Sequence, residues 1–427
     1  KQSLAQALTA MITASNSQLP NQKTSLANIP FEQFCLDSRQ LAANDVFVLL
    51  KSHTPNCQKS RDYLYQAAQN AAFILAEIDP RALLIKANVP PHANLALTDD
   101  NAESIAQQQL DRLPCPVLYV PNIRDFLGGL IQARLQYQQS VTLPTVVAVT
   151  GTNGKTTISQ LVAQLTQLTG MSSAVMGTAG NGRLGALVQA SHTTGDALAV
   201  QQFLYQMGTE NAELLALEAS SHGLDQQRLQ GMPVSVAIYT NLSRDHLDYH
   251  ADMAEYAAAK AKLFDKAHFP ELTHAIINID DEHAQIMLDT AQASQLTVWT
   301  YSLDPEKSAT FVAAEIKPSL QGVEIALRTD FGNEKINIIN VVSPLLGRFN
   351  VANLLAAIGA AVALEISLER IAAVIPQLQG AVGRMQRVPS NDGCFIVDYA
   401  HTPDALSQVL ASLKTHCKGQ LWAVFGC

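Results

Sequence analysis

Apolar residues follow two alternating patterns along this chain, short β-branched runs and longer amphipathic stretches. The short runs of the middle part read TVVAVT, SSAVMG, AELLALEA, VSVAIYT and HAIINID, and the amphipathic segments between them are long enough for crossover helices. Short runs rich in valine and isoleucine are typical of buried parallel strands. The pattern therefore predicts an α/β fold with a central, doubly wound, mostly parallel sheet.

Two further blocks flank this central domain. Residues 1–122 hold the runs DVFVLL and AAFILAE with the helix-like RDYLYQAAQNA between them, which predicts a small N-terminal α/β domain. We expect the central domain to span residues 123–380, to begin with a helix over IRDFLGGLIQARLQYQ, and to carry an antiparallel flap where residues 310–342 alternate with period two. Residues 381–427 hold CFIVDYA, a helix and QLWAVFGC, which predicts two strands and one helix of an incomplete, Rossmann-like C-terminal domain.

Composition narrows the class of protein. The 427 residues are 48% hydrophobic and 15% charged, which excludes a disordered chain, and the net charge of -9 argues against a nucleic-acid partner. The six cysteines include no C-x-x-C pair, so a reducing compartment suits them better than a disulfide frame. The longest apolar stretch, VANLLAAIGAAVALEI, contains Asn353 and Glu365 and is too short for a membrane span. These features predict a cytoplasmic, soluble protein.

The stretch AVTGTNGKTT joins a predicted strand, which ends at Thr150, to a predicted helix that closes with Gly170. In this context free backbone N–H groups and the helix dipole face a phosphate, Lys155 adds a positive charge, and the Thr156 hydroxyl can reach Mg²⁺. Two residues separate the glycines instead of the usual four, which predicts a tighter loop around the phosphates. The predicted ATP-binding loop consists of Gly151, Thr152, Asn153, Gly154, Lys155, Thr156 and Thr157.

Polar residues also follow two other predicted strands. Glu218 ends LLALE, and His246 lies in NLSRDHLDYH after VAIYT. Because ligands lie outside the carboxyl ends of strands in open α/β sheets, we expect both side chains to converge on one crevice, where they are candidate ligands of a divalent metal ion. The next segment, ADMAEYAAAKAKLFDKA, is predicted to be a helix, and from the residues alone Lys260 and Lys262 are expected on its surface.

Eight ordered motifs resemble the ATP-dependent Mur ligases of peptidoglycan synthesis. They read TGTNGKTT, HTTG, EASSHGLDQQR, TNLSRDHLDYH, YAAAKAKLF, GRFNVANLLAA, GRMQRV and DYAHTPDAL, and they cover nearly the whole chain. The resemblance is greatest to the branch that adds the third amino acid to UDP-N-acetylmuramoyl-L-alanyl-D-glutamate. The short glycine spacing is normal in this family.

The resemblance implies a mechanism. ATP would phosphorylate the free D-glutamyl carboxylate, and the amine of a diamino acid, with meso-diaminopimelate preferred and L-lysine possible, would attack the acyl phosphate. Lys155, His246 and Lys260 are the implied catalytic residues. Two Mg²⁺ ions are implied, with Thr156, Glu218, His246 and Lys260 as the metal site, Lys260 carrying a carbamate derived from CO₂. Lys262 stays a surface lysine.

Further ligand residues follow from the resemblance alone. The UDP-linked substrate is expected at Leu36, Ser38, His53, Thr193, Thr194, Ser220, Gln226 and Arg228. ATP is expected also at Asn350 or Asn353, Arg384, Asp398 and His401, between domains. A monomer is expected, with neither nucleic acid nor membrane as a partner. The family's acceptor site for the diamino acid is expected beyond Cys427.

Two alternatives remain open on the sequence. A folylpolyglutamate synthetase shares the fold and the acyl-phosphate chemistry, and a non-catalytic nucleotide-sugar binding scaffold would share the fold alone. The five residues Lys155, Thr156, Glu218, His246 and Lys260 favour the ligase, because a binding scaffold has no use for all of them. An incomplete third domain leaves the activity of this chain itself open.

Overall fold

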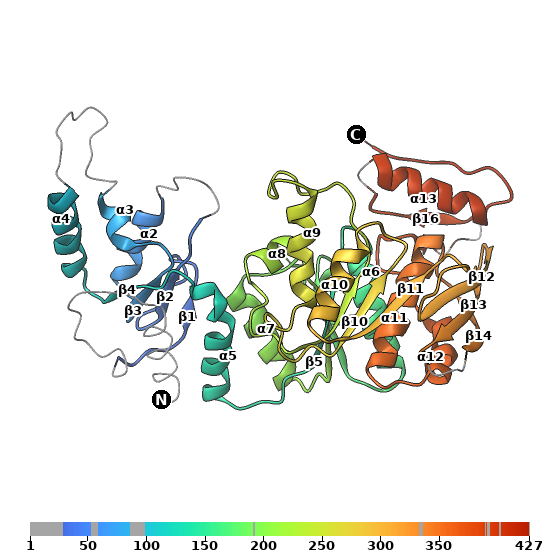
Figure 1. Ribbon diagram of the computed structural model, residues 1–427, viewed down its shortest axis with the longest axis horizontal. Coiled ribbons are helices and arrows are strands. Elements are labelled where there is room, and N and C mark those ends of the chain that lie inside the picture. Colours follow the sequence, from blue (N-terminus) through green and yellow to red (C-terminus); the bar gives the residue numbers. More distant parts are fainter. Residues whose placement is uncertain are drawn as a thin grey trace. The chain divides into compact units, whose positions relative to one another are not determined.

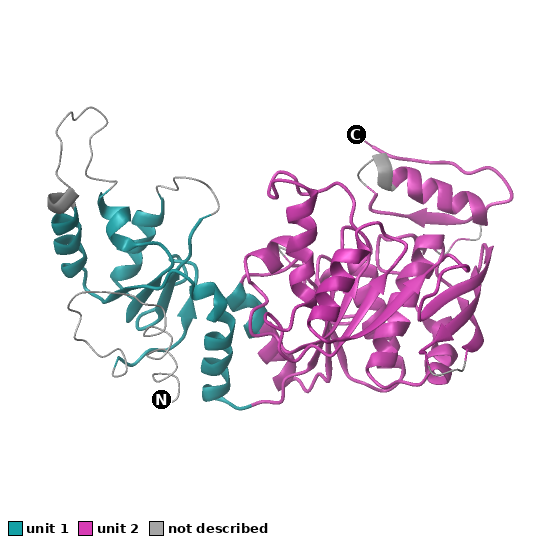
Figure 2. Ribbon diagram, viewed as in Figure 1, with its two compact units in different colours: residues 1–140, 197–202 teal, residues 141–196, 203–427 magenta. Residues whose placement is uncertain are grey.

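The chain forms two compact units. The computed structural model describes residues 29–52, 59–85, 99–190, 193–332, 336–388, 390, 393–400 and 403–426 (Figure 1). The first unit comprises residues 1–140 with 197–202, and the second comprises residues 141–196 with 203–427 (Figure 2). Two expected ligand residues, His53 and His401, lie outside the described residues.

A four-stranded parallel sheet in the order β1-β2-β3-β4 forms the centre of the first unit. Its strands are β1 (Phe34–Cys35), β2 (Val46–Leu49), β3 (Phe73–Ala76) and β4 (Val117–Tyr119), and its helices are α2 (Lys59–Ala68), α3 (Pro80–Ile85) and α4 (Asp99–Asp111). Every residue of β2 and β3 is buried. Such unbroken burial is typical of parallel strands with both faces covered.

Helix α5 (Leu127–Gln138), preceded by the short turn η2 (Ile123–Asp125), belongs to this first unit. Its residues Leu127, Leu130 and Ile131 pack in one cluster with Phe34 and Val46 of the small sheet. We expected this helix to begin the central domain. The first unit instead extends to Ser140, beyond the boundary at residue 122 read from the sequence, because the apolar face of α5 is buried against the first sheet.

The second unit is built on a ten-stranded sheet in the order β14-β13-β12-β11-β10-β9-β5-β8-β6-β7. Its strands are β5 (Thr145–Thr150), β6 (Ser173–Gly177), β7 (Gly180–Arg183), β8 (Leu214–Glu218), β9 (Val234–Tyr239), β10 (His274–Asn278), β11 (Thr297–Ser302), β12 (Phe311–Ser319), β13 (Gly322–Asp330) and β14 (Ile336–Ser343). The seven strands β12, β11, β10, β9, β5, β8 and β6, which are consecutive in this order, pair in parallel. Strands β7, β13 and β14 pair antiparallel to their neighbours. The predicted doubly wound sheet and its antiparallel flap are confirmed.

Helices cover the large sheet (Figure 1). They are α6 (Lys155–Leu168), α8 (Ser221–Asp225), α9 (Met253–Ala261), η3 (Lys262–Phe264), α10 (Ala284–Ala293), α11 (Arg348–Ala363), α12 (Leu368–Val374) and η4 (Ile375–Gln377). Helix α7 (Ala197–Thr209) is divided between the units, with residues 197–202 in the first and 203–209 in the second. Helix α11 is the most deeply buried of them, and at Gly359 a Cβ atom would lie 3.0 Å from Ile276 Cγ2. Glycine there lets the helix approach β10 closely. No helix in the described part of the chain has the length and apolar composition needed to cross a membrane.

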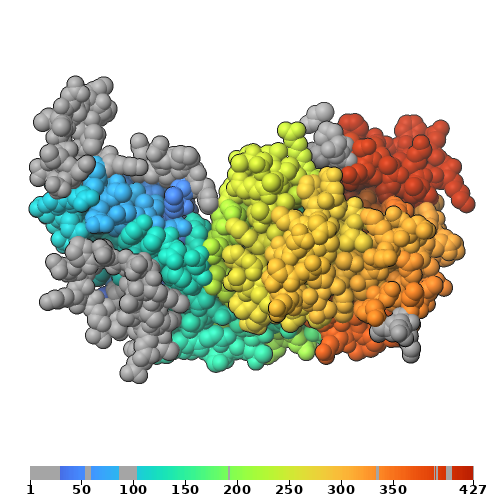
Figure 3. Space-filling model, in the orientation of Figure 1, coloured from blue at the N-terminus to red at the C-terminus, as the bar shows by residue number. Residues whose placement is uncertain are grey.

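The last segment holds a two-stranded antiparallel sheet, β15 (Gln386–Val388) with β16 (Phe395–Val397), and the helix α13 (Pro403–His416). His416 joins α13 to the large sheet: its Nε2 accepts from the Gly347 amide at 2.9 Å, and its Nδ1 lies 2.7 Å from the Ser319 carbonyl oxygen. Figure 3 shows this red segment lying on the orange part of the second unit.

The prediction of a strand at QLWAVFGC is wrong. Residues 420–426 are extended but pair with no strand among the described residues, and Trp422 is 82% exposed and Val424 98%. A strand needs a neighbour for its backbone N–H and C=O groups, and neither β15 nor β16 supplies one here.

Replacing Leu355 of α11 by alanine should destabilise the second unit. Leu355 is fully buried in the core, so its truncation should lower the free energy of unfolding by about 2–5 kcal/mol. The matched change Ile338→Ala, at a side chain of β14 that is 66% exposed, should cost less than about 1 kcal/mol. Urea unfolding followed by circular dichroism measures both. Equal losses would contradict the assigned core.

Candidate functional site

Four neighbouring parallel strands of the second unit end at one edge of the sheet. Gly151 follows β5, Thr178 follows β6, Glu218 ends β8 and Thr240 follows β9. Ligands of open α/β sheets lie outside these carboxyl ends. Sequence reasoning placed Gly151 and Glu218 there but missed Thr178, which the same rule would have found one residue after its strand.

The loop after β5 depends on two glycines. Gly151 has a φ of +146° and Gly154 a φ of +90°, a region that side chains other than glycine rarely adopt. A Cβ atom at Gly151 would lie 1.8 Å from Thr240 Oγ1, and one at Gly154 would lie 2.6 Å from Asn353 Oδ1. The short spacing therefore belongs to a tightly enclosed loop.

The residues between the glycines are held by the segment that follows β9. The Thr152 amide donates to the Asn241 carbonyl oxygen at 2.8 Å, and the Asn153 amide donates to Asn241 Oδ1 at 3.0 Å. Thr240 Oγ1 donates to the Asn153 carbonyl oxygen at 2.6 Å, and Thr152 Oγ1 lies 3.2 Å from the Tyr256 hydroxyl. These contacts fix the shape of the loop.

Lys155 is the first residue of α6, so it lies where the unpaired N–H groups of a helix begin. Its Nζ donates to the carbonyl oxygens of Gly151 at 2.9 Å and Thr152 at 2.8 Å. Burial lowers the pKa of this amine, while the carboxylates of Glu218 and Asp245 oppose the shift. This geometry places a movable donor over an anion-binding helix terminus.

Glu218 is a buried carboxylate, 2% exposed. Its Oε1 accepts from Thr156 Oγ1 at 3.0 Å and from the Thr178 amide at 2.8 Å, and Oε2 accepts from Thr178 Oγ1 at 3.2 Å. A Cβ atom at Gly177 would lie 2.1 Å from Oε1, so glycine is needed to make room for the carboxylate. No ion pair joins Glu218 to a cationic side chain of the described residues, and a buried carboxylate with only neutral donors suits a divalent cation.

His246 has a left-handed backbone with a φ of +53°. Its ring centre lies 5.0 Å from that of His222 and 5.9 Å from that of Tyr256, and its Nε2 lies 3.6 Å from Asp245 Oδ2. Burial lowers the pKa of His246, Asp245 opposes the shift, and the charge of Lys155 adds to it. The neutral imidazole that results is the form that binds metals.

Lys260 corrects the surface position expected from its residue pattern. The side chain is 1% exposed, and its Nζ donates to the Gly151 carbonyl oxygen at 3.0 Å and lies 4.4 Å from the centre of the Tyr256 ring. Burial, and after it the charge of Lys155, hold the pKa of Lys260 well below its usual value. The structure therefore brings a poorly basic amine to the phosphate loop.

The four expected metal ligands do not form a complete metal site by themselves. The oxygens of Thr156 and Glu218 lie 3.0 Å apart, but no group of three or more His, Cys, Asp or Glu side chains in the described part of the chain is arranged to hold a metal ion. The residues fit a magnesium ion that takes its remaining ligands from phosphate and water.

Three of the expected substrate residues meet beside Glu218. Thr194 Oγ1 donates to the Glu218 carbonyl oxygen at 2.9 Å and accepts from Ser220 Oγ, also at 2.9 Å. Ser220 caps α8 by accepting from the Gly223 amide, and Thr193 Oγ1 lies 3.0 Å from Thr178 Oγ1. Hydroxyl groups therefore line the site next to the candidate metal ligand.

Arg228 and Gln226 extend this group. Arg228 Nη1 donates to the Thr194 carbonyl oxygen at 3.0 Å, and its Nε and Nη2 donate to Gln226 Oε1 at 3.0 and 2.7 Å. The guanidinium group is held in one orientation by these contacts, as recognition of a carboxylate requires.

The described residues expected at ATP outside the phosphate loop lie on α11, just before β15 and just after β16. Asn353 contacts the phosphate loop and donates to Asn350 Oδ1 at 3.0 Å. The Arg384 guanidinium lies 4.7 Å from the centre of the Tyr399 ring, and its charge lowers the pKa of Lys155 as a minor contribution. Asp398 accepts from the Met385 and Ala400 amides at 2.7 and 2.8 Å.

In the first unit, the expected residues Leu36 and Ser38 follow β1. Ser38 Oγ donates to Gln66 Oε1 at 3.0 Å. Glu77, which follows β3, forms an ion pair with Arg124 at 2.8 Å and accepts from the Lys51 amide at 2.6 Å. The sequence analysis singled out neither Glu77 nor Arg124, and their ion pair connects the segments that follow β3 and β4.

Fold and site together indicate an ATP-dependent ligase class, and sequence comparison identifies the family. The Mur ligase middle domain matches residues 149–361, and the Mur ligase glutamate ligase domain matches residues 383–427. The chain is 38% identical over 407 residues to the UDP-N-acetylmuramoyl-L-alanyl-D-glutamate--2,6-diaminopimelate ligase of Haemophilus ducreyi, covering 93% of this chain and 75% of that protein. This chain belongs to the Mur ligase family.

Other relatives agree. The protein of the same name from Pseudomonas aeruginosa is 48% identical over 283 residues, which are 66% of this chain and 56% of that protein. A solved structure of a UDP-N-acetylmuramoyl-L-alanyl-D-glutamate--2,6-diaminopimelate ligase aligns with a TM-score of 0.76 and 41% identity, covering 93% of this chain and 73% of that chain. A Mycobacterium tuberculosis folylpolyglutamate synthase aligns over 68% of this chain and 69% of that chain, with a TM-score of 0.54 and 17% identity, a likeness of fold alone.

The imidazoles beside the site should make stability depend on pH. Burial, followed by the nearby His246 and His250, lowers the pKa of His222 from 6.5 to about 4. Between these values the unfolded chain binds a proton that the folded chain does not, so the free energy of unfolding should fall as the pH is lowered from about 7 to 4. Urea unfolding at several pH values measures the slope.

His222→Gln should reduce this loss of stability on acidification, because the variant has no imidazole to protonate at that position. His268→Gln, which lies outside the imidazole group, is the matched control and should keep the slope of the unchanged protein. The assignment of the pH dependence to His222 fails if both variants lose stability equally steeply.

Proposed function

We propose that this chain acts as an ATP-dependent amide ligase that joins a diamino acid, meso-diaminopimelate before L-lysine, to UDP-N-acetylmuramoyl-L-alanyl-D-glutamate in peptidoglycan precursor synthesis. The observation that carries the proposal is the meeting of Lys155, Thr156, Glu218, His246 and Lys260 at one edge of the large sheet. The names of relatives at 38% and 48% identity support this substrate over a folate.

Phosphate binding is assigned to the loop between β5 and α6. The backbone N–H groups at the start of α6 and the Lys155 side chain would take the phosphates of ATP, with the Lys155 amine leaving the carbonyl oxygens of Gly151 and Thr152 for a phosphate oxygen. Thr156, Glu218 and His246 would hold Mg²⁺, and two ions are expected, which neutralise the phosphate charge when bound.

The reaction depends more on the alignment of the two substrates than on acid or base groups of the protein. The D-glutamyl carboxylate attacks the terminal phosphorus, ADP leaves, and the amine of the diamino acid displaces phosphate from the acyl phosphate. Thr193, Thr194, Ser220, Gln226 and Arg228 are assigned to the substrate's peptide end, and Leu36 and Ser38 to its nucleotide sugar. Asn350, Asn353, Arg384 and Asp398 are assigned to ATP. Holding two anions in line is how a protein accelerates such transfers.

Lys260 is assigned a carbamate. Its neutral amine would form a bond to the carbon of CO₂ and release one proton to water, which leaves an anionic carbamate. An anion suits a position beside Lys155 and a metal ion better than an ammonium group does. The low proton affinity of the buried amine supports this assignment, because the unprotonated amine is the form that reacts with CO₂.

Partner and location follow from the same proposal. ATP and a UDP-linked precursor are cytoplasmic metabolites, so we assign the protein to the cytoplasm, and the free cysteines Cys35, Cys115, Cys394 and Cys417 suit that reducing compartment. The net charge of -9 supports the absence of a nucleic-acid partner. A monomer is the simplest assembly for this site.

Phosphate release tests the reaction. The protein, extended by any further C-terminal sequence of its gene, should release phosphate from ATP only when UDP-N-acetylmuramoyl-L-alanyl-D-glutamate and a diamino acid are both present. Comparing meso-diaminopimelate with L-lysine identifies the acceptor. Release from ATP alone at an unchanged rate would contradict the ligase, and turnover with a folate and glutamate would favour the alternative.

Replacing Lys260 by alanine tests the carbamate. Lys260→Ala should lower turnover at least about a hundredfold, since it removes the negative group expected beside the metal site. Short carboxylates such as acetate should restore part of the activity by filling the space. Lys266→Ala, a change of the same kind six residues later, is the matched control and should retain full activity. Undiminished activity of Lys260→Ala would exclude the assigned role.

A further inference from the structure

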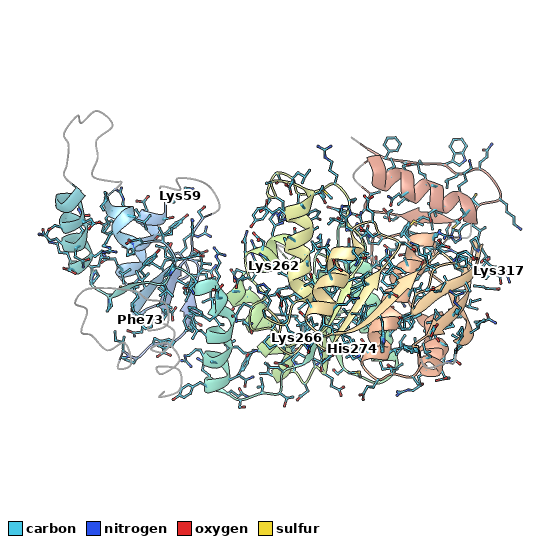
Figure 4. All side chains as sticks on the ribbon, in the orientation of Figure 1. Lys59, Phe73, Lys262, Lys266, His274 and Lys317 are labelled. Carbon is cyan, nitrogen blue, oxygen red and sulfur yellow. The ribbon has the colours of Figure 1, made fainter. Side chains whose placement is uncertain are left out.

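Lys262 is not the free surface lysine that we expected. It lies at the end of α9, where Figure 4 labels it, and its Nζ donates to Asp225 Oδ1 at 2.7 Å. Both side chains are partly buried, 33% exposed for Lys262 and 29% for Asp225. Although burial raises the pKa of Asp225, hydrogen bonds from Lys262 and Tyr249 hold it below its usual value. The ion pair therefore joins α9 to the end of α8.

The same carboxylate begins a chain of hydrogen bonds that ends at the substrate residues. Asp225 Oδ2 accepts from the Tyr249 hydroxyl at 2.8 Å, and the Tyr249 hydroxyl accepts from Gln226 Nε2 at 3.2 Å. Gln226 Oε1 in turn accepts from Arg228, whose Nη1 also donates to the Thr194 carbonyl oxygen. Tyr249 and Gln226 each donate one of these hydrogen bonds and accept another, whereas Asp225 only accepts and Arg228 only donates.

The Tyr249 ring is itself fixed. Its centre lies 4.1 Å from the His222 ring on α8 and 4.8 Å from the His250 ring. The hydroxyl is consequently aimed at Asp225 and Gln226 by contacts on the ring. A rigid tyrosine can transmit the position of α9 to the glutamine at little cost in side-chain entropy.

We propose that Lys262, Asp225 and Tyr249 are positioning residues that hold Gln226 and Arg228 in the geometry that binds the UDP-linked peptide substrate. The proposal rests on the function proposed above. Two lysines of one short segment then have different roles. Lys260 donates to Gly151 in the phosphate loop, and Lys262 holds Asp225 at the start of the hydrogen-bond chain that leads to Arg228.

The physical reason lies in the arginine side chain. A guanidinium group recognises a carboxylate through paired hydrogen bonds only in a narrow range of orientations, and a free arginine side chain loses much rotamer freedom on binding. Gln226 holds Arg228 through two nitrogens, and Tyr249 holds the amide of Gln226 so that its oxygen faces the guanidinium. Loss of the tether should therefore weaken substrate binding without changing ATP binding.

Titration calorimetry on Tyr249→Phe and Lys262→Met tests the tether without depending on turnover. The Phe variant removes one oxygen and keeps the ring. Each variant should bind UDP-N-acetylmuramoyl-L-alanyl-D-glutamate about threefold to tenfold more weakly, the effect of one or two lost hydrogen bonds, and should bind MgATP as the unchanged protein does. Lys262→Arg should retain most of the affinity, because arginine can still pair with Asp225.

Lys266→Met is the matched control; Figure 4 labels this lysine also, and it lies outside the tether. Thermal unfolding of each variant shows that it is folded. Unchanged substrate affinity in both tether variants, or an equal loss for substrate and MgATP, would overturn the tether while leaving the ligase in place. An unchanged protein that binds neither the UDP-linked substrate nor MgATP would overturn the proposed function as well.

Discussion

The buried carboxylate of Glu218 is the group around which the second unit's site is arranged. A carboxylate that is 2% exposed is costly unless donors or cations compensate it, and here the donors are Thr156 in the first turn of α6 and Thr178 just after β6. Gly177 has no side chain because this carboxylate fills the space, and Thr156 and Thr178 direct their hydroxyls at it. The backbone carbonyl oxygen of Glu218 accepts from Thr194 Oγ1, so the candidate metal ligand also holds an expected substrate residue in place.

Two buried amines lie at the same site as this carboxylate. Lys155 and Lys260 both donate to the Gly151 carbonyl oxygen, and burial lowers the pKa of each amine. Two amines so close together favour loss of a proton or conversion of one of them to an anion. Helix α9 carries Lys260 and ends beside Lys262. By our proposal it thereby links the phosphate loop to the hydrogen-bonded residues that hold Arg228.

Much of the fold could be predicted because its signals are local. Each short apolar run of the second unit became a strand, and the helix predicted after the phosphate loop is α6. The predictions were wrong where the structure of a segment depends on contacts with residues far away in the sequence. Helix α5 packs on the first sheet, and the described residues of QLWAVFGC form no strand. The position of Lys260 was likewise undecidable from its helix, since which face of α9 is covered depends on the loop at Gly151.

The sequence by itself determined the strands β5, β6, β8, β9 and β10, the antiparallel flap, the short phosphate loop and the family, because apolar periodicity and motif spacing are properties of neighbouring residues. Only the tertiary structure decided which side chains are buried together. It placed Thr178 and Tyr256 beside the candidate site and gave Lys262 its partner Asp225. Within the described ranges it left the expected metal ligands without a complete cluster. Burial and ion pairing depend on residues brought together from far apart in the chain, and no local pattern records those distances.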